Sequence, residues 1–101
     1  TSISLHPFRI VWFYNENIDD VLIKSLIVVP KKRIKLAVQR NTIKRYIRES
    51  YRTRKFKLEE HLKHQQKQIY FAIIYNTHKE LCFKDIDVKI KWLISIVMLE
   101  I

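Results

Sequence analysis

The side chains with the clearest chemical potential are cationic, and they are concentrated between residues 31 and 57. This stretch holds twelve lysines and arginines and a single acid, Glu49, whereas the rest of the chain holds eight bases and nine acids. The local net charge is therefore +11, against −1 elsewhere. Ammonium and guanidinium groups bind phosphate oxygens strongly, and so concentrated a positive field favours a nucleic acid as the partner.

The spacing of these bases indicates a helix with one cationic side. Arg40, Lys44 and Arg48 recur every four residues, and Ile43 and Ile47 fall on the opposite side of the same helix. Like charges at this spacing mildly destabilise a helix, so a fold keeps them most readily where phosphates neutralise them. A solvated face kept for solubility is the weaker alternative. The residues predicted to bind the nucleic acid are Lys31, Lys32, Arg40, Asn41, Lys44, Arg45, Arg48 and Arg52.

No pattern in the sequence predicts a catalytic residue or a metal ligand set. There is no nucleophile beside a base and no cluster of carboxylates for metal-dependent phosphodiester hydrolysis. His61 and His64 are three residues apart, but no third ligand lies nearby, which favours two surface histidines over a metal site. The single cysteine, Cys82, excludes an internal disulfide, is compatible with the reducing cytoplasm and is interpreted as a small packing residue.

The composition is typical of one globular domain spanning residues 1–101. Apolar residues make up 48% of the chain, and no run approaches the ~20 apolar residues that a membrane-spanning helix needs. The absence of glycine excludes every phosphate-binding loop that depends on close approach of the backbone. We therefore expect a cytoplasmic protein that does not contact a membrane.

Hydrophobic periodicity predicts an α+β sandwich, with helices over one face of a small sheet. Residues 5–14 and 22–29 are predicted strands, joined by a polar turn at 15–20 and paired antiparallel. Alternation in the first strand puts one set of side chains on one face, Phe8, Ile10, Trp12 and Tyr14, and the other set on the opposite face, Pro7, Arg9, Val11 and Phe13. Residues 31–39 are either a basic loop or a loop with a short strand at 36–38. The remaining predicted elements are a long helix over 40–66 with Ile43, Ile47, Tyr51, Leu58 and Leu62 on its buried side, a strand over 68–75 and a helix over 85–101. The last helix has an apolar stripe of Ile86, Ile90, Leu93, Ile94, Val97, Met98 and Ile101.

The basic stretch also resembles a known signature. Residues 37–49 read Ala-Val-Gln-Arg-Asn-Thr-Ile-Lys-Arg-Tyr-Ile-Arg-Glu, and this segment resembles the pattern A-V-x-R-N-R-x-K-R-x-x-R-E of the bacterial ribonuclease P protein subunit. The resemblance extends over nearly the whole chain, through Pro7-Phe8-Arg9, Pro30-Lys31-Lys32 and the apolar strand ending at Tyr75. Thr42 stands where the third arginine of the pattern is expected, and residues 30–35 lack the usual glycine.

The resemblance implies a two-layer αβββαβα sandwich with a left-handed βαβ crossover around the basic helix. It therefore overrides the right-handed crossover that parallel neighbouring strands normally adopt. The family fold opens with a helix before the first strand, and this chain begins after that point. With that helix missing, we expect self-association through the uncovered sheet.

The resemblance also implies a division of labour between the protein and an RNA. The catalytic RNA of ribonuclease P cleaves the 5′ end of precursor tRNA using magnesium, and the protein binds no cofactor of its own. The protein docks on that RNA and holds the 5′ leader of precursor tRNA in a cleft between helix and sheet. Asn41, Lys44 and Arg48 would line the helix side of the cleft, and Phe8, Arg9 and Trp12 are weaker candidates from the sheet.

Two other functional classes remain as alternatives. A general basic RNA-binding module or RNA chaperone would use the same cations without a catalytic RNA partner. A nuclease acting alone would need metal ligands that the sequence does not supply.

Overall fold

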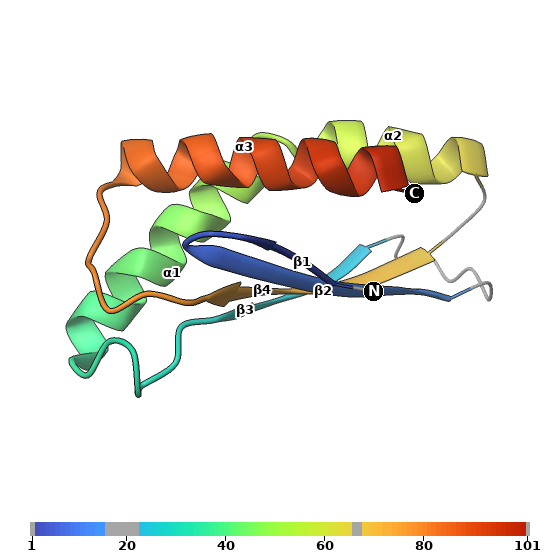
Figure 1. Cartoon of the computed structure of the whole chain (residues 1–101). Helices are drawn as coiled ribbons and strands as arrows, with labels where there is room; N and C mark the ends of the chain where they lie inside the picture. The colour runs from blue at the N-terminus through green and yellow to red at the C-terminus, as the bar shows by residue number, and fades with distance from the viewer. Residues whose placement is uncertain (1, 16–22, 66–67, 101) are drawn as a thin grey trace.

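The computed structural model describes residues 2–15, 23–65 and 68–100, which form a four-stranded sheet and three helices (Figure 1). In chain order the elements are β1 (Ser2–Leu5), β2 (Phe8–Asn15), β3 (Ile23–Val28), α1 (Ala37–Arg52), α2 (Lys55–Gln65), β4 (Gln68–Tyr75) and α3 (Phe83–Glu100). This is the predicted α+β sandwich. The predicted turn at 15–20 lies, beyond Asn15, outside the described residues. So do three residues at the ends of predicted elements, Leu22, Gln66 and Ile101.

The strand order in the sheet is β1-β2-β4-β3, which places β4 at the centre. β1 and β2 form an antiparallel hairpin around His6 and Pro7, so the single strand predicted over 5–14 is in fact parts of two strands. β2 is antiparallel to β4, and β3 is parallel to β4. The predicted antiparallel pairing of residues 5–14 with 22–29 is therefore wrong. β4 thus lies between β2 and β3 and pairs with both.

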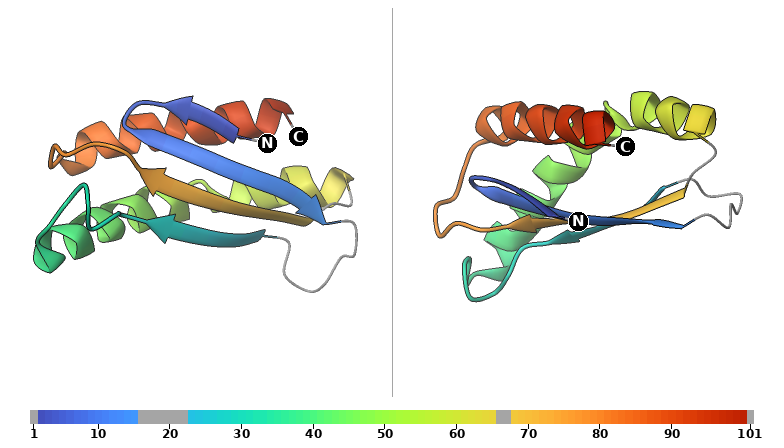
Figure 2. Two further views of the ribbon diagram at one scale, coloured as in Figure 1. Left: turned by 60° about the horizontal axis from the view of Figure 1, so that its bottom comes forward. Right: turned by 45° about the vertical axis from the view of Figure 1, so that its right-hand side comes forward.

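The connection from β3 to β4 through α1 and α2 is left-handed, as the resemblance implied (Figure 2). Seen from below the sheet, β3 and β4 run in the same direction, and the two helices return behind them (Figure 2, left). Such connections are right-handed in about 98% of cases. The hand is therefore a distinguishing feature of this fold.

The hydrophobic core lies between one face of the sheet and the helices. α2 and α3 lie over this face, and α1 runs obliquely past the β3 edge toward them (Figures 1 and 2). Phe8, Ile10 and Trp12 point into the core from β2, and alternate residues of β4 from Ile69 to Tyr75 do the same. The predicted buried residues Ile43, Ile47, Tyr51, Leu58 and Leu62 are all buried.

The long helix predicted over 40–66 is two helices, and the first begins earlier, at Ala37. No strand forms at 36–38, because Leu36 is the residue that precedes α1. The helix breaks at Thr53 and Arg54, where the Thr53 hydroxyl and the Arg54 guanidinium both donate to the Ser50 carbonyl. These side chains satisfy a carbonyl at the end of α1, and the chain changes direction into α2.

The last helix and the cysteine before it differ from the sequence-based predictions. The last helix starts at Phe83, two residues before the predicted start, and buries Ile86, Ile90 and Leu93 as its apolar stripe predicted. Cys82, expected to pack in the interior, is exposed just before that helix. Among the helices of the described residues, none is long and apolar enough to cross a membrane.

Candidate nucleic-acid interface

The outward side of α1 carries the cations that the sequence predicted. Ile43, Ile47, Ser50 and Tyr51 are buried on one side of this helix. The opposite side exposes Asn41, Arg45, Arg48 and Arg52, while Lys44 is half-buried at the margin nearest the sheet. We call these five residues, Asn41, Lys44, Arg45, Arg48 and Arg52, the basic ridge.

Arg40 differs from the basic ridge in its surroundings. It lies in the first turn of α1, is half-buried, and its Nη1 donates to the carbonyls of Ile34 and Lys35 at 3.0 and 2.7 Å. Ile34 is itself buried. Arg40 therefore ties the loop before α1 to the helix, in addition to the nucleic-acid contact predicted for it.

Arg52 forms an ion pair with Glu49, the one acid in the basic stretch. Its Nη2 lies 2.6 Å from Glu49 Oε1, and both side chains are largely exposed. The hydrogen bond from Arg52 holds the pKa of the Glu49 carboxyl below its ordinary value, so Glu49 is ionised at neutral pH. Because an exposed ion pair of this kind contributes little energy, a phosphate group competes readily for Arg52.

Thr42 follows Arg40 and Asn41 at the position where the signature has a second arginine directly after the asparagine. Its hydroxyl donates to the Val38 carbonyl at 3.0 Å, one turn earlier in α1. Thr42 thus turns its hydrogen-bonding group back to the helix backbone. The ridge has one cation fewer than the signature specifies.

The two lysines predicted from the loop before α1, Lys31 and Lys32, are exposed in a short turn. The backbone N–H groups of Arg33 and Ile34 both donate to the Pro30 carbonyl and close this turn. The neighbouring Arg33 joins it to the segment after β4, because Arg33 Nη1 lies 3.0 Å from His78 Nε2 and His78 Nδ1 lies 3.2 Å from the Arg33 carbonyl. The loop therefore holds its lysines beside the start of α1.

A groove separates the basic ridge from the edge strand β3. It has a volume of about 450 Å³ and is lined by Ser25, Leu26, Ile27, Lys44, Arg48 and Tyr51. Burial raises the pKa of the Tyr51 hydroxyl far above its ordinary value, so that group remains protonated beneath the two cations. Of the three residues that sequence analysis predicted for the helix side of a cleft, Lys44 and Arg48 line this groove and Asn41 does not.

The three residues predicted from the sheet separate into two groups. Phe8 and Trp12 are only 1% and 2% exposed, on the core face of β2. A leader-binding role for these two does not fit their burial, and we correct that assignment. Arg9, one residue along, is exposed on the opposite face, because successive side chains of a strand alternate between faces.

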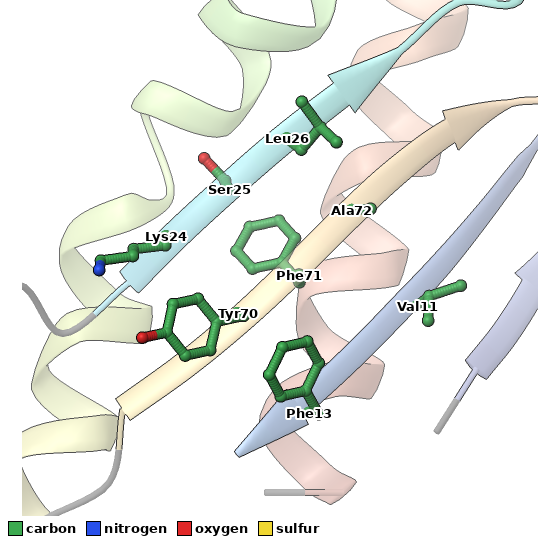
Figure 3. A pocket seen from close by; sticks show the side chains of 8 residues that line it. All are labelled: Val11, Phe13, Lys24, Ser25, Leu26, Tyr70, Phe71 and Ala72. Carbon is green, nitrogen blue, oxygen red and sulfur yellow. The ribbon is translucent and has the colours of Figure 1, made fainter. Parts of the chain in front are cut away.

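That opposite face of the sheet carries aromatic residues that the sequence analysis did not assign to a site. Phe13 of β2 stacks on Tyr70 of β4 with ring centroids 5.0 Å apart, and Lys24 Nζ lies 5.3 Å from the Tyr70 centroid. They border an open hollow of about 290 Å³ whose floor is Val11, Leu26 and Ala72 (Figure 3). The alternation that placed Phe13 beside Arg9 and Val11 was the signal available in the sequence.

The groove and this open face are continuous around β3. Ser25 and Leu26 line both hollows, so one surface extends from Lys44 and Arg48 across the edge strand to Tyr70 and Phe13. Cations at one end and stacked aromatic rings at the other are the combination with which proteins hold single-stranded nucleic acid.

Comparisons with known proteins identify the family of the chain. The family model described as Ribonuclease P matches residues 1–97. The ribonuclease P protein components of two strains of Porphyromonas gingivalis are each 37% identical over 71 residues, which cover 70% of this chain and 50% of the relative. The chain thus spans about half the length of these curated relatives.

A solved structure of a ribonuclease P protein has the same fold as this chain. The RNase P protein of Staphylococcus aureus superposes with a TM-score of 0.75 at 26% identity, covering 96% of this chain and 80% of that one. With the family model matching almost end to end, this chain belongs to the ribonuclease P protein family.

Proposed function

We propose that this chain is the protein subunit of a ribonuclease P, which assists a catalytic RNA in removing the 5′ leader of precursor tRNA. The observation that carries the proposal is the continuous surface from Lys44 and Arg48 around β3 to the Phe13–Tyr70 stack. A surface of cations and aromatic rings suits an unpaired RNA strand of any sequence. Membership of the family supplies the reaction to which such a strand belongs.

The proposal divides the basic residues between two RNA molecules. Asn41, Arg45 and Arg52 point outward on the basic ridge, with Arg40, Lys31 and Lys32 at its N-terminal end, and we assign them to the catalytic RNA. Arginine forms bidentate contacts with phosphate, which suits docking on a folded RNA. Lys44 and Arg48 line the groove beside β3, and we assign them to the leader.

The leader path continues over the open face of the sheet. From the groove it would pass Leu26, which both hollows share, and reach Tyr70 and Phe13, with Arg9 exposed on the same face. Bases stacked on these rings would place their phosphates within reach of the surrounding cations. The chemical step belongs to the RNA and its magnesium ions, and the protein contributes affinity in the cytoplasm.

Leader dependence tests this assignment. The complex of the protein with its catalytic RNA should bind precursor tRNA more tightly than mature tRNA, which lacks the leader. Lys44→Ala should reduce that preference severalfold and leave the affinity for mature tRNA unchanged. As a matched control, Lys63→Ala removes an exposed lysine from α2 that lines neither the groove nor the hollow on the open face. Equal loss for both tRNAs would contradict the assignment of Lys44 to the leader.

A second copy of the chain is the competing occupant of the open face. On this face Phe13 and Leu26 are 60% and 61% exposed, and large apolar side chains of this kind associate in water. Sedimentation of the protein without the catalytic RNA, in the presence and absence of a short single-stranded RNA, distinguishes a second copy of the chain from the leader as the occupant. A dimer that persists when RNA binds and dissociates in Phe13→Ser would overturn the leader path.

A further inference from the structure

The basic ridge has a second hollow, on the side away from β3, where α1 meets the start of α3. Arg45, Tyr46, Glu49 and Phe83 line an open space of about 370 Å³. Phe83 is the first residue of α3 and lies 38 positions after Arg45 in the chain, so the sequence pattern gave no sign that they meet. We call this space the aromatic notch.

The rings of the aromatic notch are held in place by one another. Tyr46 and Phe83 meet edge to face, with centroids 5.7 Å apart and planes at 62°. The Arg45 guanidinium carbon lies 5.8 Å from the Tyr46 centroid, within the range of a cation–π contact. Phe83 nevertheless leaves 38% of its surface exposed to solvent. An apolar ring is thus partly exposed to water beside Arg45 of the basic ridge.

We propose that the aromatic notch accepts an unpaired nucleobase of the RNA that docks on the basic ridge. This inference rests on the proposed function and names a specific contact within it. Folded RNAs expose single bases in loops and bulges, and proteins bind such bases by stacking them on aromatic rings and arginine planes. Phe83 supplies the ring, and Arg45 supplies a cation for the adjoining phosphate.

Glu49 gives the aromatic notch a preference among bases. Its carboxylate is ionised, because the Arg52 hydrogen bond holds its pKa low, and an ionised carboxylate only accepts hydrogen bonds. It therefore favours a base edge that carries an exocyclic amino group, as in adenine, guanine or cytosine, over uracil.

The experiment compares conservative variants of Phe83 in the complex with the catalytic RNA. Phe83→Leu keeps apolar bulk against Tyr46 but removes the stacking surface, and Phe83→Tyr retains it. Phe83→Leu should weaken binding of the catalytic RNA by roughly fivefold or more, as expected for the loss of one stacked base. Phe83→Tyr should bind like the unchanged protein. Phe56→Leu, which removes a more exposed ring from α2, serves as the control and should have no effect.

Two further readouts separate stacking of a base on Phe83 from packing of Phe83 within the protein. The salt dependence of binding should be unchanged in Phe83→Leu, because no phosphate contact is lost. Affinity for a fully paired RNA duplex should also be unchanged. If Phe83→Leu weakens duplex and catalytic RNA equally, or if Phe83→Tyr fails in the same way, the ring serves packing only and the inference is overturned.

The outcome also distinguishes this inference from the function on which it rests. If Arg45→Ala weakens binding of the catalytic RNA while Phe83→Leu does not, no base binds in the aromatic notch, but the basic ridge still binds the catalytic RNA. If neither variant affects binding of the catalytic RNA, the proposed function itself fails. A protein ligand in the notch would instead leave all RNA affinities unchanged in Phe83→Leu.

Discussion

Arg54 and Asp87 connect the end of the basic helix to α3 through an ion pair, with Arg54 Nη1 2.8 Å from Asp87 Oδ1. The same carboxylate oxygen accepts a hydrogen bond of 2.7 Å from the hydroxyl of Ser50, which is buried in α1. Arg54, one of the twelve bases in the basic stretch, is thus engaged in a partly buried ion pair within the protein. The pair fixes the orientation of α1, and with it the basic ridge, relative to α3.

Removing Asp87 should destabilise the fold in a pH-dependent way. Hydrogen bonds from Arg54 and Ser50 hold the pKa of Asp87 below its ordinary value of 3.8. A lowered carboxyl pKa contributes stability that is present above 3.8 and is lost as the pH falls through the folded-state value. Asp87→Ala should lower the free energy of unfolding by about 1–2 kcal/mol at pH 7. Denaturant titrations should show the difference shrinking below pH 4, and an unchanged difference at pH 3 would contradict this account.

The salt dependence of RNA binding should distinguish structural from docking arginines. Arg45→Ala removes an exposed guanidinium of the basic ridge, and the slope of log affinity against log salt should fall by about one counterion. Arg54→Ala removes a guanidinium that Asp87 already neutralises, and should leave this slope unchanged. Filter binding of the catalytic RNA between low and moderate salt measures both. Equal slopes for the two variants would refute the distinction.

The corrected assignment of β2 predicts opposite behaviour for neighbouring residues. Trp12→Ala should cost about 3–5 kcal/mol of stability, because it leaves a cavity in the core, where Trp12 is 2% exposed. Arg9→Ala, on the exposed face, should leave the unfolding midpoint within experimental error and weaken leader binding. Measurements of thermal unfolding and of leader affinity on both variants test these two predictions. A stable Trp12→Ala protein would show that this side chain is not part of the core.

Phe13 provides a test of stacking on the open face of the sheet. Phe13→Leu keeps an apolar side chain and removes the ring that stacks on Tyr70 at 5.0 Å. We expect affinity for a single-stranded leader to fall by about 1 kcal/mol or more, the lower end of what one stacked base contributes. Fluorescence titration with a short unstructured RNA measures it. Phe13→Tyr is the matched control, and its failure to bind normally would point to strand packing instead.

The sequence predicted the parts of this molecule that depend on local pattern. The buried side of α1 followed from the spacing of Ile43 and Ile47, and the position of the cations followed from the same periodicity. Alternation in β2 correctly separated the face of Phe8 and Trp12 from that of Arg9 and Phe13. Which of these faces the helices would cover depended on contacts with α3, which local alternation does not encode.

Long-range partners account for what the sequence analysis missed. β3 pairs with β4 rather than β2, because β4 follows a crossover of two helices and inserts between them. At the break between α1 and α2, Arg54 also donates to Asp87, more than thirty residues later in the chain. Likewise, Phe83 reaches the basic ridge only through the packing of α3 on α1. The left-handed crossover came from the family resemblance, since general rules favour the other hand.

The most direct test of the central claim is reconstitution with the ribonuclease P RNA of the same organism. At magnesium concentrations where that RNA alone cleaves precursor tRNA slowly, addition of the protein should raise the rate of 5′ leader removal. The Lys44→Ala, Arg48→Ala double variant should give much less enhancement. No enhancement by the unchanged protein, measured with RNA that is active at high magnesium, would contradict the account.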